Sequence, residues 1–391
     1  MIDFEFGLPT KIIFGRDKEN EVGTIINKYG YKKVLVHFGK GSVIRSGLLS
    51  RVEKSLKENN IDYILVGGVE ANPKASFVKE VLTIAHQQNI DFILAIGGGS
   101  VIDSAKSIAV GYYYDGDPFD FNLHKVTPTK ALPIGTILTI SAAGSEMSSS
   151  CVISNEETKI KRGFNSELVR PIFSIMNPTL TYSVSPYQTA CGIVDIMMHS
   201  MERYFAPSSE IELCDTFALG ICKTVYEAGK KVMQDPLDYE ARAPLMLASS
   251  FSHNDVTNIG KVKIMPVHAL EHVLSGVYDH VAHGAGLAVL FPAWAEVVYE
   301  NDIDKFAQFA HYVFGISLTD SKECAKMGIV KLKEFYQSIG MPASYRDLGI
   351  TEDIDLDLFW NLLSNGGTFL PNSLGGPLDK DKATKIFSLC R

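Results

Sequence analysis

The feature that most constrains the fold is a change of hydrophobic pattern near residue 184. Before that point, short apolar runs rich in β-branched residues alternate with amphipathic stretches, which is typical of βαβ units and a parallel sheet. After it, as far as about Val313, long amphipathic runs rich in Ala, Leu, Glu and Met replace this alternation. A chain of 391 residues is also too long for one ordinary hydrophobic core. The sequence therefore predicts an α/β plus all-α protein, with a parallel-sheet domain over residues 1–184 and a helical domain over residues 185–391.

The first domain carries the clearest secondary-structure signals. Two amphipathic helices are predicted at Leu48 to Glu58 and Phe77 to Gln88, where apolar residues recur at three- and four-residue spacing. The second domain should begin with a helix, because Ser185 is a good N-cap residue and Pro186 suits the first helical position. The predicted strands are Lys33 to Phe38, Ile61 to Val66, Phe92 to Ile96 and Ile134 to Ile140.

Composition excludes several classes of protein. The formal net charge of −8 argues against a nucleic-acid binder, which needs a basic face. No segment approaches the ~20 apolar residues that span a bilayer, and the first residues lack the pattern of a signal peptide. The six cysteines are scattered without a CxxC pair, so we expect reduced thiols. These features predict a cytoplasmic protein with no nucleic-acid or membrane partner.

A glycine-rich loop, Gly97-Gly98-Gly99-Ser100, directly follows the predicted strand Phe92 to Ile96 and precedes a predicted helix. Glycines let a ligand approach the backbone closely, and the N–H groups of a first helical turn favour an anion. A pyrophosphate bound there is the functional interpretation, and a tight turn with nothing bound is the alternative. The loop does not match the GxGxxG fingerprint.

A second loop, from Gly39 to Ser42, follows the predicted strand Lys33 to Phe38. In NAD-selective sites an acidic residue commonly follows such a strand and binds the ribose 2′-hydroxyl, and no acid stands here. Lys40 and Ser42 can instead donate to a 2′-phosphate, which favours NADP; Lys40 as a solvated surface lysine is the alternative. Lys161 and Arg162 are further candidates, in a stretch that could equally be an exposed loop.

Histidines gather in the second domain. Asp195 and His199 are four residues apart in the helix that begins at Pro186, so both side chains point the same way. His268 and His272 form a second pair at the same spacing, and His283 follows a short break. One carboxylate with imidazoles from separate segments is a normal way to hold Fe²⁺ or Zn²⁺ with a position left open. His253 and His280 fit this pattern less well. They are interpreted either as surface residues or as residues that contact the metal ligands without binding the metal.

Taken together, these motifs resemble the iron-containing, or group III, alcohol dehydrogenase family, and within it the NADP-dependent butanol dehydrogenase branch. The resemblance runs from Pro9–Gly15 to the histidine cluster near Pro292. It includes the glycine loop, the stretch from Leu138 to Glu146, and His283-Gly284-Ala285-Gly286. It implies a dehydroquinate synthase-like fold, in which a Rossmann-like domain binds the cofactor and a helical domain binds the metal in the cleft between them. A homodimer is the first expectation for its assembly.

The resemblance also assigns site residues. It implies a divalent metal, Fe²⁺ first with Zn²⁺ as the alternative, bound by Asp195, His199, His268 and His283. It places the cofactor phosphates on Gly97, Gly98, Gly99 and Ser100. The remaining candidate cofactor residues are Gly39, Lys40, Ser42, Asn72, Asp103, Thr139, Ser141, Ser145 and Lys161.

The predicted reaction is hydride transfer between NADP(H) and a small primary alcohol or aldehyde such as butanol or butanal. The metal is expected to act as a Lewis acid on the substrate oxygen. His272, one turn beyond His268, is the candidate proton relay, and an orienting role is equally open.

Three other functions share some of these sequence features. A dehydroquinate synthase-type lyase would need basic groups for an anionic substrate, whereas Asp195 is followed by Ile196, Met197 and Met198. A glycerol dehydrogenase-like zinc enzyme is closer. What distinguishes it is the fourth metal ligand, since the candidate ligands here are Asp195 and three histidines. A non-catalytic metal-binding protein would not need the cofactor loops.

Overall fold

The computed structural model describes residues 1–207 and 211–391, which form two compact units. One unit is Gly7–Ser183, and the other combines Val184–Arg391 with Met1–Phe6. The sequence had placed the first six residues in the α/β domain. Instead, the backbone N–H of Ile2 donates to the carbonyl of Gly260 in the helical unit (3.0 Å). In a segment this short, the alternation of Ile2, Phe4 and Phe6 with two acidic residues does not reveal which unit it contacts.

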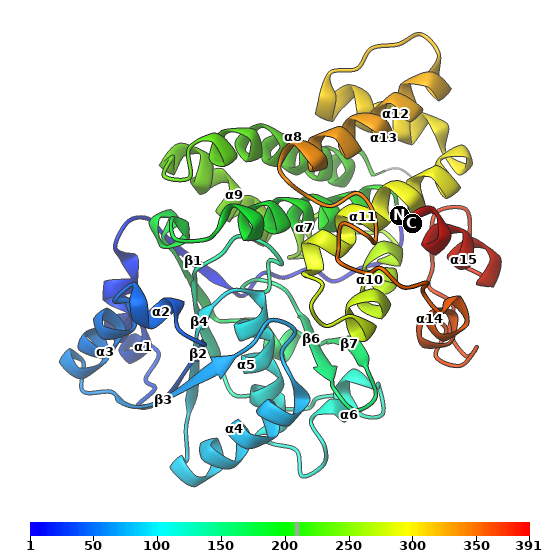
Figure 1. Ribbon diagram of the computed structural model, residues 1–391. Coiled ribbons are helices and arrows are strands. Elements are labelled where there is room, and N and C mark those ends of the chain that lie inside the picture. Colours follow the sequence, from blue (N-terminus) through cyan, green and yellow to red (C-terminus); the bar gives the residue numbers. More distant parts are fainter. Residues whose placement is uncertain (208–210) are drawn as a thin grey trace. The chain divides into compact units, whose positions relative to one another are not determined.

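The unit Gly7–Ser183 is built on a six-stranded sheet in which every neighbouring pair is parallel (Figure 1). The four predicted strands are all present, and the predicted fold class is confirmed. In spatial order the strands are β1 (Lys11–Phe14), β8 (Phe173–Met176), β5 (Ile134–Leu138), β4 (Phe92–Gly97), β2 (Lys33–Gly39) and β3 (Asp62–Val69).

Two strands of this sheet and one hairpin were not predicted. β1 and β8 have four residues each and pair with one another, so neither carries enough alternation to be recognised alone. The stretch around Lys161 is not a loop but the second strand of an antiparallel hairpin, β6 (Ser150–Asn155) and β7 (Ile160–Asn165). Lys159 turns the hairpin with a φ of 55°, in the left-handed region.

Helices cover both faces of the sheet (Figure 1). Alternate residues of β2 and β4, among them Val36 and Leu94, share one core with residues of the first helices, such as Val52. Because every residue of β4 is buried, this strand is covered on both faces, as expected for a central parallel strand. The helices of this unit are α1 (Val22–Lys28), α2 (Ser42–Arg45), α3 (Leu48–Glu58), α4 (Ala75–Gln88), α5 (Gly99–Gly111) and α6 (Phe119–Asn122), with short 3₁₀ turns at Lys18–Glu21, Glu167–Val169 and Pro178–Thr181.

The sheet order decides where a ligand can bind. β3 lies outside β2 on one side, while β4 and β5 continue on the other, so the strand order reverses between β2 and β4. In open parallel sheets, ligands bind beyond the carboxyl ends of the strands at such a reversal. The loops that follow β2, β3, β4 and β5 all begin at this edge.

The second unit consists of helices around one large apolar core. α7 (Pro186–Tyr204) begins as predicted, with the side chain of Ser185 accepting from the backbone N–H of Gln188. No helix among the described residues is long and apolar enough to cross a membrane. The other helices are α8 (Glu212–Gln234), α9 (Tyr239–Ser252), α10 (Pro266–Val277), α11 (His283–Val298), α12 (Ile303–Phe314), α13 (Ser321–Ser338), α14 (Leu356–Leu363) and α15 (Lys380–Leu389), with 3₁₀ turns at Val256–Asn258 and Tyr299–Asn301.

Candidate functional site

Three helices of the second unit bring the four predicted metal ligands together. α7 carries Asp195 and His199, α10 carries His268 in its first turn, and α11 begins at His283. One oxygen of Asp195, Oδ1, lies 3.2 Å from Nδ1 of His199, 3.6 Å from Nε2 of His268 and 3.8 Å from Nε2 of His283. Three ring nitrogens from three helices thus face a single carboxylate oxygen.

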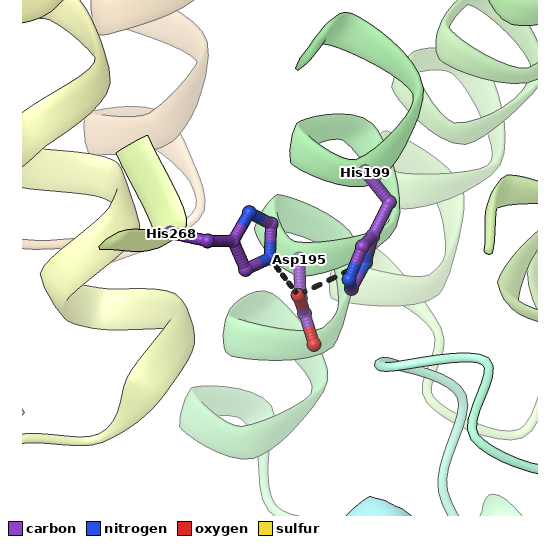
Figure 2. Close-up of side chains that lie close together, drawn as sticks. All are labelled: Asp195, His199 and His268. Carbon is purple, nitrogen blue, oxygen red and sulfur yellow. Dashed lines mark ion pairs between the residues drawn. The ribbon is translucent and has the colours of Figure 1, made fainter. Parts of the chain in front are cut away.

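The chemistry of these atoms fits a cation (Figure 2). Asp195, His199 and His268 are each at most 4% exposed. The atoms that face one another, Oδ1, Nδ1 and Nε2 respectively, have no hydrogen-bond partner among the described residues. Buried polar atoms without a partner are costly, because water no longer solvates them. A divalent metal accepts lone pairs from all of them at once, so the donor set suits Fe²⁺ or Zn²⁺.

The ionisation of the two buried histidines differs. Burial, together with the neighbouring His253 and His268, holds the pKa of His199 well below its ordinary value, so this ring is neutral. Burial also lowers the pKa of His268, but the carboxylates of Glu202 and Asp195 outweigh it and raise the pKa to about 9. A metal bound here would therefore displace a proton from His268.

His272, the predicted proton relay, lies beside this cluster. Its ring centroid is 6.3 Å from that of His268 and 5.6 Å from that of His283, and the residue is half-buried. It also forms a second group with Glu271 and His283 whose ligand atoms lie within 4.8 Å of one another. Its position suits proton exchange with solvent.

His253, which the sequence suggested was a surface or outer residue, is not at the surface. It is 7% exposed and stacks on His199, with ring centroids 4.0 Å apart. The chain turns at His253 directly after α9, and no periodic pattern marks this position.

Two carboxylates that the sequence pattern did not indicate contact two of the predicted ligands. Glu202 contacts Nδ1 of His268, and Glu271 contacts Nδ1 of His283. Both glutamates are fully buried. A signal for Glu202 was available, because it follows Asp195 by seven residues and therefore lies on the same face of α7.

The cofactor loops occupy the expected edge of the sheet in the other unit. Gly97 ends β4, Gly98 is the N-cap residue of α5, and Gly99 and Ser100 form its first turn. All three glycines have ordinary φ, and a Cβ on Gly97 or Gly98 would lie within 2.5 Å of Val101 or Ile140. Packing of the loop is thus enough to require glycine at these two positions, whether or not a phosphate binds.

The loop after β2 has an acidic neighbour that the sequence did not indicate. Glu70, just beyond β3, forms an ion pair with Lys40. No acid follows β2 in the sequence, and this carboxylate comes from the end of the adjacent strand, β3. Lys40 and Ser42 are exposed, and a Cβ on Gly39 would meet only ordinary contacts.

Asp103 and Ser145 are joined to one another. Ser145 Oγ donates to Asp103 Oδ1 (2.5 Å), and the backbone N–H of Val152 donates to Oδ2 (2.9 Å). Burial raises the pKa of Asp103, and the nearby charges of Lys106 and Lys161 oppose this rise. Asp103 therefore connects the start of the hairpin to α5. Because both of its oxygens already accept hydrogen bonds within the protein, a cofactor would have to compete for them.

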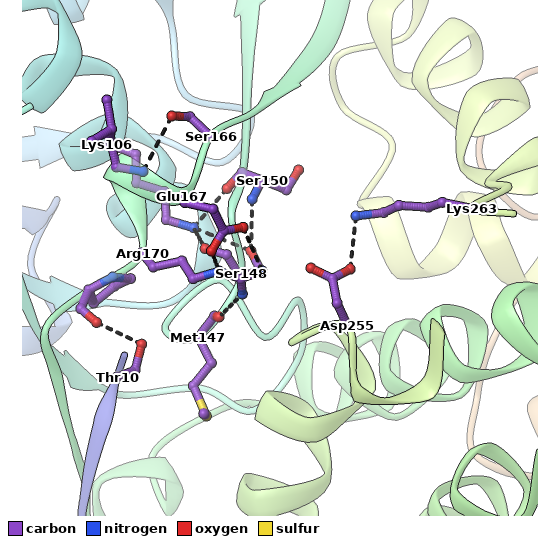
Figure 3. Close-up of polar contacts among 12 residues, drawn as sticks. Thr10, Lys106, Met147, Ser148, Ser150, Ser166, Glu167, Arg170, Asp255 and Lys263 are labelled. Atoms are coloured by element: carbon purple, nitrogen blue, oxygen red, sulfur yellow. Dashed lines mark hydrogen bonds and ion pairs between the residues drawn. The ribbon is translucent and has the colours of Figure 1, made fainter. Parts of the chain in front are cut away.

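Lys106, one turn after Asp103, makes the second tie (Figure 3). Its fully buried Nζ donates to the carbonyls of Ser148 (2.9 Å) and Ser150 (2.7 Å), and burial lowers its pKa to about 8. The segment between β5 and β6, which carries three predicted cofactor residues, is thus held by two residues of one helix face. Of the other predicted positions, Thr139 follows β5 and donates its backbone N–H to Gly97 (3.1 Å), Ser141 is half-buried, and Asn72 is buried with a φ of 54°.

Comparison with known proteins identifies the family. Residues 9–178 match iron-containing alcohol dehydrogenase, and residues 189–359 match the C-terminal region of the Fe-containing alcohol dehydrogenase family. The chain belongs to the iron-containing alcohol dehydrogenase family. The family and the reaction class predicted from the sequence, alcohol dehydrogenase or aldehyde reductase, are thereby confirmed.

Similar family members cover 90% or more of the chain. The NADH-dependent butanol dehydrogenase A of Clostridium acetobutylicum is 41% identical over 99% of both chains. The NADPH-dependent aldehyde reductase YqhD of Escherichia coli is 31% identical over 90% of both. The crystal structure of an NADH-dependent butanol dehydrogenase A from Thermotoga maritima has a TM-score of 0.95, with 36% identity over 100% of this chain and 99% of that one.

Proposed function

We propose that this enzyme interconverts a small primary alcohol and its aldehyde, of the size of butanol and butanal, with NADP(H) as hydride carrier and a divalent metal. Asp195, His199, His268 and His283 hold the metal, with Fe²⁺ first and Zn²⁺ as the alternative. The convergence of three ring nitrogens on Asp195 Oδ1, within 3.8 Å, carries this proposal. The names of the similar butanol dehydrogenases support the substrate class.

The metal would supply Lewis acidity at the substrate oxygen and NADP(H) would carry the hydride. With three neutral imidazoles and one carboxylate, a divalent metal would leave the site with a net charge of about +1, which would stabilise a developing negative oxygen. His272 lies at the more open side of the cluster and passes the hydroxyl proton to solvent through its ring nitrogens. An orienting role for His272 is the alternative.

The decisive experiment uses metal-stripped protein. Fe²⁺ and Zn²⁺ are returned separately, and oxidation of NADPH by butanal is followed by absorbance. We expect turnover only with metal, and none in Asp195→Asn or His199→Ala with either metal. Equal turnover in stripped and reloaded protein would overturn the metal site.

The preference for NADP(H) rests on the loop after β2. Lys40 and Ser42 are exposed donors at the carboxyl edge of the sheet, and Lys161 lies near Asp103 in the same unit. Glu70 opposes this preference because it pairs with Lys40, and the relatives' names include both cofactors. A 2′-phosphate would compete with Glu70 for the ammonium of Lys40.

The cofactor preference is tested by comparing KM for NADPH and NADH. We expect Lys40→Ala to raise KM for NADPH about twofold to fivefold, the range of an exposed charge contact, and to leave NADH unchanged. Glu70→Gln should have the opposite effect. Lys54→Ala, which removes another exposed lysine with a glutamate partner, is the matched control. An unchanged ratio in both variants, or a wild type that prefers NADH, would contradict the assignment.

Three broader properties belong to the same proposal. We expect a homodimer, which sedimentation would test, and a cytoplasmic location, which fractionation would test. The remaining proposed cofactor contacts are Gly39, Asn72, Gly97, Gly98, Gly99, Ser100, Asp103, Thr139, Ser141 and Ser145.

A further inference from the structure

Two of the proposed metal ligands have the same arrangement behind them. In His268 and in His283, Nε2 faces Asp195 and Nδ1 contacts a fully buried glutamate. We propose that Glu202 and Glu271 are positioning residues that hold His268 and His283 in the one tautomer able to bind a metal. This inference rests on the proposed metal site.

Glu202 is held in place by the N-terminus of a helix. Its Oε1 accepts from the backbone N–H of Val267 (2.6 Å) and of His268 (3.3 Å), in the first turn of α10. The N-cap residue of this helix, Met265, has no polar side chain with which to accept these bonds. A carboxylate is favoured at a helix N-terminus, and the other oxygen of Glu202, Oε2, accepts from Nδ1–H of His268.

Glu271 repeats the arrangement one turn later. It lies on α10 and contacts Nδ1 of His283, the first residue of α11. The close approach of the two helices depends on Gly286, because a Cβ there would lie 2.9 Å from Cγ of Glu271. The glycine on α11 thus leaves the space that the carboxylate side chain on α10 occupies.

The tautomer matters because a neutral imidazole has one N–H and one lone pair. With the proton on Nδ1, the lone pair of Nε2 points at the metal position; with the proton on Nε2, it does not. A glutamine in place of either glutamate can turn its NH₂ group toward Nδ1 and so favour the wrong tautomer. Loss of such an outer carboxylate typically costs about 10- to 100-fold in metal affinity.

The test measures Zn²⁺ affinity by competition with a chelating dye in Glu202→Gln and Glu271→Gln. Glu296→Gln is the matched control, because Glu296 is exposed and lies on the same helix as His283. We expect each of the first two variants to bind Zn²⁺ about 10- to 100-fold more weakly and the control to match wild type. Glu202→Asp, which keeps the charge, should recover part of the affinity if Glu202→Gln fails to fold.

A second readout separates positioning from general stability. In zinc-loaded protein with ¹⁵N-labelled histidine, wild type should show slowly exchanging Nδ1–H resonances for His268 and His283. Glu202→Gln should lose the first and Glu271→Gln the second, while the unfolding midpoint of the metal-free protein stays near that of wild type. Retention of both resonances and of wild-type affinity overturns the inference. A wild type that binds Zn²⁺ no better than His199→Ala overturns the proposed metal site instead.

Discussion

The imidazole ring of His253 lies on that of His199, with centroids 4.0 Å apart and planes inclined by 24°. Both rings are buried, and the second faces Asp195 across 3.2 Å. A stacked ring restricts rotation of its neighbour, so His253 keeps His199 directed at the proposed metal position.

We therefore predict that His253→Ala weakens Zn²⁺ binding and lowers the free energy of unfolding by on the order of 2 kcal/mol, the usual range for a buried side chain replaced by a small one. His253→Phe keeps a ring in place and should retain most of the Zn²⁺ affinity. Dye competition and denaturant unfolding measure the two quantities. If Zn²⁺ binds equally well to the alanine and phenylalanine variants, the stack does not orient His199.

Gly284 follows His283 where α11 crosses α7. A Cβ at this position would lie 2.2 Å from the backbone carbonyl oxygen of Cys191, which a side-chain rotation cannot relieve. Gly284→Ala should thus force the two helices apart, destabilise the protein by about 2 kcal/mol or more and displace His283.

Gly220→Ala is the matched control, since Gly220 lies inside α8 and a Cβ there meets nothing within 4 Å. Alanine favours a helix over glycine, so this variant should unfold at equal or slightly higher denaturant concentration. If the two variants are equally stable, α7 and α11 can move apart at Gly284 without loss of stability.

Gly39 gives a direct test of the cofactor loop. A Cβ there would lie 3.6 Å from the carbonyl oxygen of Val69, an ordinary contact, so the protein alone tolerates Gly39→Ala. If the ribose phosphate lies against this residue, the added methyl group should weaken NADPH binding by about tenfold with no loss of stability. Fluorescence titration measures the affinity. Unchanged NADPH binding would remove Gly39 from the proposed contacts.

His37 makes stability depend on pH. It is buried on β2, Nδ1 lies 3.1 Å from the carbonyl oxygen of Val66, and Nε2 lies 2.9 Å from Ser104 Oγ. Burial lowers its pKa from 6.5 to about 4, despite the opposing hydrogen bond to Val66. Between these pH values His37 binds a proton in the unfolded chain but not in the folded protein. The free energy of unfolding therefore falls as the pH drops from 6.5 toward 4.

The full loss from this residue is on the order of 3 kcal/mol. In His37→Gln this contribution is absent, so the stability difference between wild type and variant should shrink as the pH falls from 7 to 5. Urea unfolding at both pH values measures it. If the stability difference between wild type and His37→Gln stays constant, His37 is not the group that takes up this proton on unfolding.

Much of the fold could be predicted because its signals are local. The strands at Lys33–Gly39 and Phe92–Gly97 and the helix at Leu48–Glu58 repeat their pattern over enough residues to be recognised alone. Strands β1 and β8 escaped prediction, since each is four residues long and is stabilised by pairing with neighbouring strands, β1 with β8 and β8 also with β5.

The sequence by itself determined the two kinds of secondary structure, the glycine loop and the candidate ligand pairs, because residues one helical turn apart must share a face. Only the tertiary structure decided which groups meet from distant segments. It placed Glu202 behind His268, 66 residues along the chain, His253 on His199, and Glu70 beside Lys40. Spacing along a chain constrains direction within one element, whereas contacts between elements depend on how their faces pack.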